Sequence, residues 1–161
     1  MQNISTCLWF DDQAEQAVNY YIGIFSNSRI LEIKYCTEGM PGPAGSVLTI
    51  RFTLDGTEYV TLNGGPHFKF SPAISLVAYC DTQAEVDRLW SRLTEGGQES
   101  QCGWLIDKFG VSWQIVPRPL LELLNTPDKA ASERAVAAMM QMRKLDIAAL
   151  QRAYKSTQGT T

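Results

Sequence analysis

Few side chains in this sequence combine a residue type and a spacing suited to catalysis. The single histidine, His67, lies in NGGPHFKF, and a loop imidazole can act as a general base or as a ligand. No second histidine and no adjacent acid would orient it for proton transfer, which favours an exposed or capped loop residue. Four scattered cysteines form no CxxC or Cys/His cluster, so they indicate buried, reduced thiols and no zinc site: Cys7, Cys36, Cys80 and Cys102.

Composition limits the classes of partner. The 161 residues are 45% hydrophobic and carry a net charge of -3, which fits one compact domain or two half-domains sharing a core. Neither nucleic acid nor an anionic membrane is indicated, because the net charge of -3 and the pI near 5.1 give no basic footprint. The first residues, MQNISTCLWFDDQAE, lack the basic region of a secretory signal, and no apolar run is long enough to cross a membrane. We therefore expect a soluble, cytoplasmic protein whose partners are small molecules or proteins.

Two similar pentapeptides must be positioned by similar elements. DDQAE at 11–15 and DTQAE at 81–85 each follow a short apolar run and precede an amphipathic one. The first copy predicts a strand over Ile4–Phe10 and a helix capped by Asp12, with Glu15 three residues later. The second predicts a strand over Ile74–Cys80 and a helix capped by Asp81 or Thr82, with Glu85 in the matching place.

Each helix is followed by a β-rich stretch. The predicted strands are Ile30–Cys36, Ser46–Leu54 and Glu58–Asn63 in the first half, then 98–101, Gly103–Ile106 and Val111–Val116 in the second. Asp55-Gly56 is typical of a hairpin turn. The sequence thus predicts an α+β fold of two βαβββ modules, residues 1–66 and 67–117, followed by a helical extension over 118–161.

The extension carries apolar residues at helical spacing. Leu120 begins a short helix, Thr126-Pro127 starts a second, and Asp146 opens a third. The methionines of the second helix indicate packing rather than a cofactor site. So much apolar surface needs a partner, either the sheets of the same chain or a second subunit.

Pairing two such sheets would leave a concave cup, a common place for a ligand. Strand alternation separates the residues that pack on the helices from those that face the cup. A mixed wall of aromatic and neutral polar side chains suits a neutral, partly aromatic ligand, although bulky tryptophans or a neighbouring subunit could fill the cup instead. The candidate ligand-binding residues are Ser5, Cys7, Trp9, Glu58, Ser75, Tyr79, Ser112 and Gln114, with Val60 and Val77 beside them and His67 in the connection.

Three segments carry a resemblance to a known family. LNGGPHFKFSPAISLVAYCDTQAEVDRLWSRL, CGWLIDKFGVSWQIVP and MMQMRKLDIAALQRAY resemble the PhnB-like family of the vicinal oxygen chelate superfamily, which includes glyoxalase I, bleomycin-resistance proteins and extradiol dioxygenases. The resemblance implies the fold of paired βαβββ modules (the glyoxalase/bleomycin resistance/dihydroxybiphenyl dioxygenase-like fold) and a homodimer. Many family members carry the name 3-demethylubiquinone-9 3-methyltransferase.

The residues do not support the chemistry of that name. Nucleotide-cofactor methyltransferases usually have a glycine-rich turn that opens the first helix, and neither strand-helix junction here contains glycine.

Metal-binding members of the superfamily offer His or Gln where each module's first strand opens and Glu in each last strand. This chain offers Ile4, Ser5 or Thr6 and Ile74, Ser75 or Leu76 at the openings, then Val60, Thr61 or Leu62 and Gln114 in the last strands. We expect no metal and no other cofactor.

Two function classes remain open at this point. One is a small-molecule-binding or sequestering protein, which the sequence slightly favours. The other is an enzyme of lyase, isomerase or dioxygenase type acting on a small metabolite, and a methyltransferase is the least supported alternative. Acid-base catalysis would require a second titratable group near Gln114 or His67, for which Cys7, Glu58 and Tyr79 are the candidates.

Overall fold

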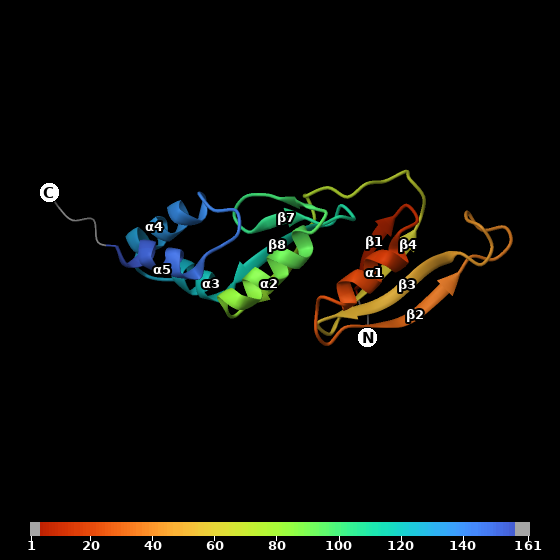
Figure 1. Ribbon diagram of the computed structural model, residues 1–161, viewed down its shortest axis with the longest axis horizontal. Helices are drawn as coiled ribbons and strands as arrows, with labels where there is room; N and C mark the ends of the chain where they lie inside the picture. The colour runs from red at the N-terminus through yellow and green to blue at the C-terminus, as the bar shows by residue number, and fades with distance from the viewer. Residues whose placement is uncertain (1–3, 157–161) are drawn as a thin grey trace. The chain divides into compact units, whose positions relative to one another are not determined.

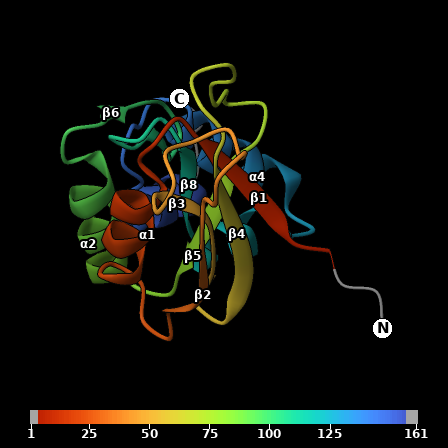
Figure 2. The ribbon, with the colours of Figure 1, turned by 90° about the vertical axis from the view of Figure 1, so that its right-hand side faces the viewer.

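The computed structural model describes residues 4–156 of the chain, drawn in two orientations in Figures 1 and 2. The chain divides after Phe70 into two compact units, Met1–Phe70 and Ser71–Thr161. The C-terminal helices belong to the second unit. No helix among the described residues is long and apolar enough to cross a membrane.

The first unit is one four-stranded sheet with one helix. Its strand order is β1-β4-β3-β2, with β1 parallel to β4 and the other neighbours antiparallel. Helix α1 packs against the sheet through Ala14, Ala17, Val18 and Tyr21, all buried. The elements are β1 (Thr6–Phe10), α1 (Ala14–Ile22), β2 (Arg29–Tyr35), β3 (Val47–Leu54) and β4 (Thr57–Asn63).

The second unit repeats this topology. Its sheet order is β5-β8-β7-β6, with β5 parallel to β8. Helix α2 buries Val86, Leu89, Trp90 and Leu93, the apolar stripe expected from their spacing. The elements are β5 (Leu76–Cys80), α2 (Gln83–Thr94), β6 (Gln98–Glu99), β7 (Trp104–Ile106) and β8 (Ser112–Pro117). The predicted pair of βαβββ modules is confirmed.

The two helices begin by different means. Thr82 caps α2 in a reciprocal capping box with Glu85, as predicted. The same prediction for α1 was wrong. Asp12 makes no cap, the N-cap position is Gln13, and the amide of Ala14 donates instead to Asn63 Oδ1 at 2.9 Å. Asn63, at the end of β4, therefore accepts the hydrogen bond at the start of α1 that the sequence predicted for Asp12.

Two turns can be traced to particular residues of the sequence. Asp55 and Gly56 have φ of 46° and 78° and join β3 to β4, which confirms the predicted hairpin turn. In DKFG, the buried Asp107 carboxylate accepts bonds from the backbone amides of Phe109 and Val111 and from the Trp113 indole at 2.8 Å. Asp107 therefore stabilises the turn before β8.

Helices α3 (Arg118–Leu124), α4 (Lys129–Met139) and α5 (Ile147–Lys155) follow β8. The predicted helical extension is thus present, with Asp128 and Asp146 as its side-chain caps for α4 and α5. These helices share a small core of Leu120, Leu145 and Leu150, against which Met139 and Met142 pack.

The apolar residues of the extension are therefore largely covered within the chain. Leu150 is fully buried, whereas Met140 remains 56% exposed. Of the two partners left open for this surface, the chain itself covers the central part, because Leu145 and Leu150 are buried in the core that these helices share.

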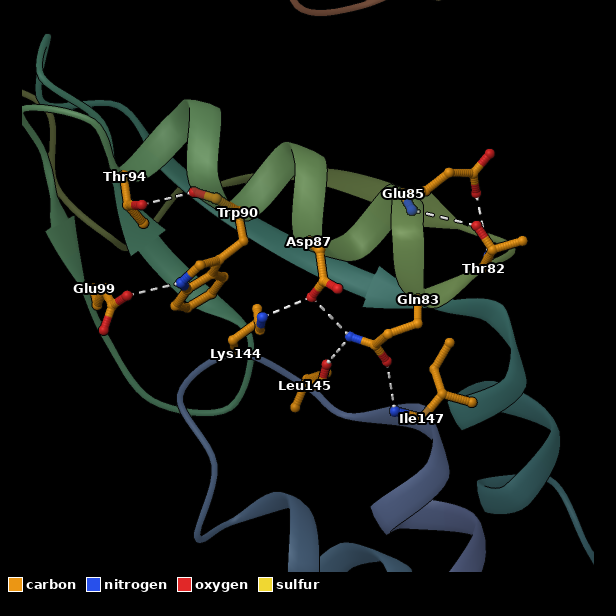
Figure 3. A network of polar contacts seen from close by, with 10 residues as sticks. All are labelled: Thr82, Gln83, Glu85, Asp87, Trp90, Thr94, Glu99, Lys144, Leu145 and Ile147. Carbon is orange, nitrogen blue, oxygen red and sulfur yellow. Dashed lines mark hydrogen bonds and ion pairs between the residues drawn. The ribbon is translucent and has the colours of Figure 1, made fainter.

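The extension is tied to α2 by a polar network (Figure 3). The Gln83 amide receives the Ile147 amide proton at 2.8 Å and donates to the Leu145 carbonyl and to Asp87. Lys144 pairs with the same Asp87 carboxylate at 2.6 Å. The extension also contacts the loop between β6 and β7, where the backbone amides of Cys102 and Gly103 donate to the carbonyls of Met142 and Arg143.

Candidate functional site

Each sheet has one face covered by its helix and one that no helix of its βαβββ module covers, called here the open face. In β1, Leu8 and Phe10 are buried on the helix side, whereas Cys7 is exposed and Trp9 is half-buried on the open face. In β5, Leu76 and Cys80 are buried on the helix side, whereas Val77 and Tyr79 are 42% and 51% exposed. The predicted division of the two first strands therefore matches the burial pattern.

The open face of the first unit combines apolar residues with a charged network. Cys7 lies beside Val60 in the register between β1 and β4. Arg51 Nη2 pairs with Glu58 Oε1 at 2.8 Å, and Arg51 also approaches Glu32 at 3.6 Å. The hydrogen bond and charge of Glu58 raise the pKa of Arg51 above its usual range. Glu58 is therefore an ion-pair partner, and Arg51 is a member of this face that the sequence did not single out.

Trp9 lies against the connection that ends the unit. Its Nε1 donates to the Gly65 carbonyl at 2.9 Å, and its ring meets Phe68 edge-on with centroids 5.0 Å apart. Gly64 must lack a side chain, because a Cβ there would come within 2.2 Å of the Trp9 ring. The Gly64-Gly65 pair is the only signal for this packing in the local sequence, and it does not identify Trp9 as the partner.

Ser5 and His67 lie at the edges of the unit. Ser5 precedes β1, is exposed and donates to the Glu58 carbonyl at 3.0 Å. His67 is exposed in the connection, as favoured above, and no described carboxylate forms an ion pair with it.

The open face of the second unit is mainly neutral. Gln114 Nε2 donates to Ser75 Oγ at 2.9 Å, and Gln114 lies beside Val77 in the parallel register. The guanidinium of Arg118 lies over the Tyr79 ring, 5.1 Å from the ring centroid. Arg118 also pairs with Asp81 at 3.0 Å. Arg118 is a second residue that sequence patterns did not reveal, because it follows β8 at the start of a helix.

Ser112 has an unusual environment. Its side chain shares a face of β8 with Gln114, since Trp113 between them points to the helix side. It is 2% exposed, and its hydroxyl has no hydrogen-bond partner among the described residues. Buried hydroxyls are normally satisfied, so this one requires a physical account.

The two registers show which positions of the modules correspond. Cys7 pairs with Val60 and Val77 pairs with Gln114, which makes Val60 the counterpart of Gln114. Of the positions considered above for metal ligands, those on the open faces are Ser5 and Val60 in one module and Ser75 and Gln114 in the other. One aliphatic and three neutral polar side chains do not fit a divalent cation, which needs several carboxylate or imidazole ligands. The described residues contain no group of three His, Cys, Asp or Glu side chains able to hold one.

The cysteines differ in exposure, and all four are free thiols. Cys36 and Cys80 are buried as expected, but Cys7 is exposed and Cys102 is partly exposed, so the prediction of burial was wrong for these two. Burial raises the pKa of Cys80 to about 11, and partial desolvation of the otherwise exposed Cys7 raises the pKa of that thiol above its ordinary value. Neither environment activates a thiolate nucleophile.

One cavity of about 380 Å³ lies in the first unit, between the start of α1 and the loop that joins β2 to β3. Three carboxylates form one side and the proline-rich loop forms the other. None of the predicted site residues lines it. Its lining residues are Asp11, Asp12, Glu15, Cys36, Pro41, Gly42, Pro43, Ser46, Val47, Asn63 and Gly65.

Comparison with known proteins agrees with this geometry. The family model described as 3-demethylubiquinone-9 3-methyltransferase matches residues 2–116. A solved PhnB protein from Bacillus cereus, provisionally named as such a methyltransferase, is 36% identical, with a TM-score of 0.67 over 72% of this chain and 99% of that one. No curated protein matches.

More distant solved structures share the fold alone. A Pseudomonas aeruginosa protein is 20% identical with a TM-score of 0.60, covering 73% of this chain and 98% of that one. The fosfomycin resistance protein FosX from Mesorhizobium loti is 14% identical with a TM-score of 0.51, covering 71% and 90%. The chain belongs to the PhnB-like family described as 3-demethylubiquinone-9 3-methyltransferase.

Proposed function

We propose that this protein binds a neutral small molecule on the open faces of its sheets and uses no catalytic divalent metal there. The observation that carries the proposal is the Gln114–Ser75 hydrogen bond, with Val60 at the corresponding position of the first module. A neutral amide bonded to a hydroxyl replaces the charged ligand set that metal chemistry needs.

The surroundings favour an uncharged ligand with an apolar body. Val77 and Tyr79 expose apolar surface on the second open face, and the first offers Cys7, Trp9 and Val60. Arg51 and Arg118 are both paired with carboxylates, so neither is an uncompensated charge for an anion. Ligand sites commonly combine such apolar walls with a few fixed polar groups.

Saturation-transfer NMR with a library of neutral aromatic fragments tests the binding. We expect several fragments to bind the native chain and to lose most of their signal with Val77→Lys, which places a charge on the open face. Met40→Lys, at a comparably exposed apolar residue of the loop that joins β2 to β3, is the matched control and should bind normally. Equal fragment binding by the two variants would contradict the proposed binding site on the open face.

Elemental analysis of the purified protein tests the metal. We expect zinc, nickel, iron and manganese well below one equivalent per chain. A stoichiometric metal that is lost with Gln114→Ala would overturn this part of the proposal.

An enzyme acting on a small metabolite is the alternative function. Such an enzyme would need an acid-base pair, but Glu58 is paired with Arg51 and His67 lies exposed in the connection. The methyltransferase of the family name is supported least, since neither strand-helix junction has a glycine-rich turn. Calorimetry with S-adenosylmethionine should show no binding.

Assembly and location are part of the same proposal. We infer a homodimer from the superfamily resemblance, together with the exposed Leu121, Val136 and Met140 of the C-terminal helices. We also propose a cytoplasmic location.

A further inference from the structure

We propose that Ser75, Ser112 and Gln114 form a subsite for the hydroxyl group of a neutral ligand, such as a phenol or an alcohol. This inference rests on the proposed function and names the chemical group that the second open face selects.

The register brings the three side chains together. Leu76 pairs with Trp113, and Ser75 and Ser112 are the residues that precede them on the two parallel strands. The two serines therefore lie side by side at the start of the strands. The Gln114 amide reaches back to Ser75 Oγ at 2.9 Å, which joins all three positions on one face.

The hydrogen-bond inventory defines what is missing. The Ser112 hydroxyl is buried and has no partner, a state that costs free energy in a folded protein. Gln114 uses its Nε2 group on Ser75, which leaves its carbonyl oxygen as an acceptor. A donor and an acceptor thus remain two residues apart on one face of β8, where Ser75 and Gln114 are both half-buried.

A hydroxyl group satisfies both requirements at once. Its oxygen accepts from Ser112, and its proton is donated to Gln114 Oε1. A carboxylate can only accept and would face the amide oxygen without a neighbouring cation, whereas a hydrocarbon leaves both groups unpaired. The subsite therefore favours a neutral hydroxyl over an anion or an apolar group.

The first module shows that this is not a general property of the fold. Its counterpart of Ser112 is Glu58, which is paired with Arg51, and its counterpart of Gln114 is Val60. At these two corresponding positions, the second module has a neutral donor and acceptor and the first does not.

Titration of ¹⁵N-labelled full-length protein with phenol, toluene and benzoate at pH 7 tests the subsite, with the Gln114 side-chain amide as reporter. We expect phenol to bind about 5- to 10-fold more tightly than toluene or benzoate, the effect of one hydrogen bond that would otherwise be missing. Ser112→Ala should remove this advantage and leave toluene unchanged. Ser91→Ala, an exposed serine of α2, is the matched control.

Thermal unfolding supplies an independent readout. Ser112→Ala should keep or raise the unfolding temperature, because it removes an unpartnered buried hydroxyl. A lowered temperature would show that Ser112 has a structural partner and would overturn the inference. So would unchanged phenol affinity in Ser112→Ala, or benzoate binding as tight as phenol.

The outcomes separate the two proposals. Equal binding of phenol and toluene, with resonance changes at Val77 and Tyr79, would overturn the hydroxyl subsite and leave the proposed binding function intact. If none of the probes changes resonances on the open faces, both proposals fail.

Discussion

At the scale of single residues, the contact between Trp9 and Gly64 shows how one side chain fixes another. Gly64 does not need a positive φ, so its missing side chain is explained by the approach of the indole ring. Gly64→Ala should destabilise the protein by about 1–3 kcal/mol, the usual cost of overpacking. Urea unfolding measures this, and adding Trp9→Leu should recover most of the loss. An unchanged unfolding free energy for the single variant would show that the ring does not lie there.

Cys80 predicts a dependence of stability on alkaline pH. Its folded pKa of about 11 lies above the ordinary thiol value of 9.0, because burial disfavours the thiolate. The unfolded chain therefore releases this proton first, and the contribution of Cys80 to stability is complete below about pH 9 and is lost as the pH rises toward 11. Urea unfolding between pH 8 and pH 11 should show a shallower decline for Cys80→Ala. Parallel curves for both proteins would contradict the shifted pKa.

Sequence reasoning found which residues share a face, but not all of their partners. Alternation placed Cys7, Trp9 and Tyr79 correctly, since the period of a strand is local information. Glu58 was considered for the cup without its partner Arg51, because that pairing depends on the register between two strands.

At the scale of elements, the two helix starts can be compared in one protein. Thr82→Ala should cost about 1 kcal/mol, the value of a side-chain cap. Asn63→Ala should cost a similar amount because Asn63 Oδ1 accepts the Ala14 amide proton of α1. Asp12→Ala should stay within about 0.5 kcal/mol, as for an ordinary surface position. Chemical denaturation would contradict this account if Asp12→Ala were the most damaging of the three.

Gln83 predicts how firmly the extension is held. Gln83→Ala removes bonds to Ile147, Leu145 and Asp87, so we expect a loss of about 1–3 kcal/mol and faster amide exchange at Ile147. Gln16→Ala on the exposed side of α1 is the matched control. Unchanged exchange at Ile147 would mean that Gln83 does not hold the extension.

Elements were predictable where the signal was local. Thr82 with Glu85 and Asp55 with Gly56 gave a helix start and a hairpin correctly. The acceptor at the start of α1 was not predicted, because Asn63 is distant in the sequence. The DDQAE pattern by itself predicts a capped helix and does not point to Asn63.

At the scale of the whole molecule, assembly remains a proposal with a direct test. We expect light scattering at micromolar concentration to give the mass of a dimer, and a stable interface buries more than about 1,200 Å². Met140→Lys should weaken the dimer if the C-terminal helices form the contact, because Met140 is the most exposed methionine described there. A monomer mass for the intact chain would refute the dimer. Removal of residues 127–161 is not a suitable test, since Leu145 and Leu150 belong to the core of their own unit.

The duplicated fold was predictable from the repeat, whereas the packing of the extension was not. Apolar helical spacing shows that a surface must be covered, but not by which partner. Here the segment before α5 lies along α2, through contacts such as Gln83 with Ile147 that no local pattern encodes.

The most direct test of the central claim is a map of backbone and side-chain resonances in ¹⁵N-labelled protein during titration with phenol. The account predicts changes at residues of the open faces, above all Val77, Tyr79 and the Gln114 side chain, with little change at Val86 and Leu89 on the buried side of α2. Changes confined to the cavity beside Asp12 and Glu15, or no changes at all, would contradict it.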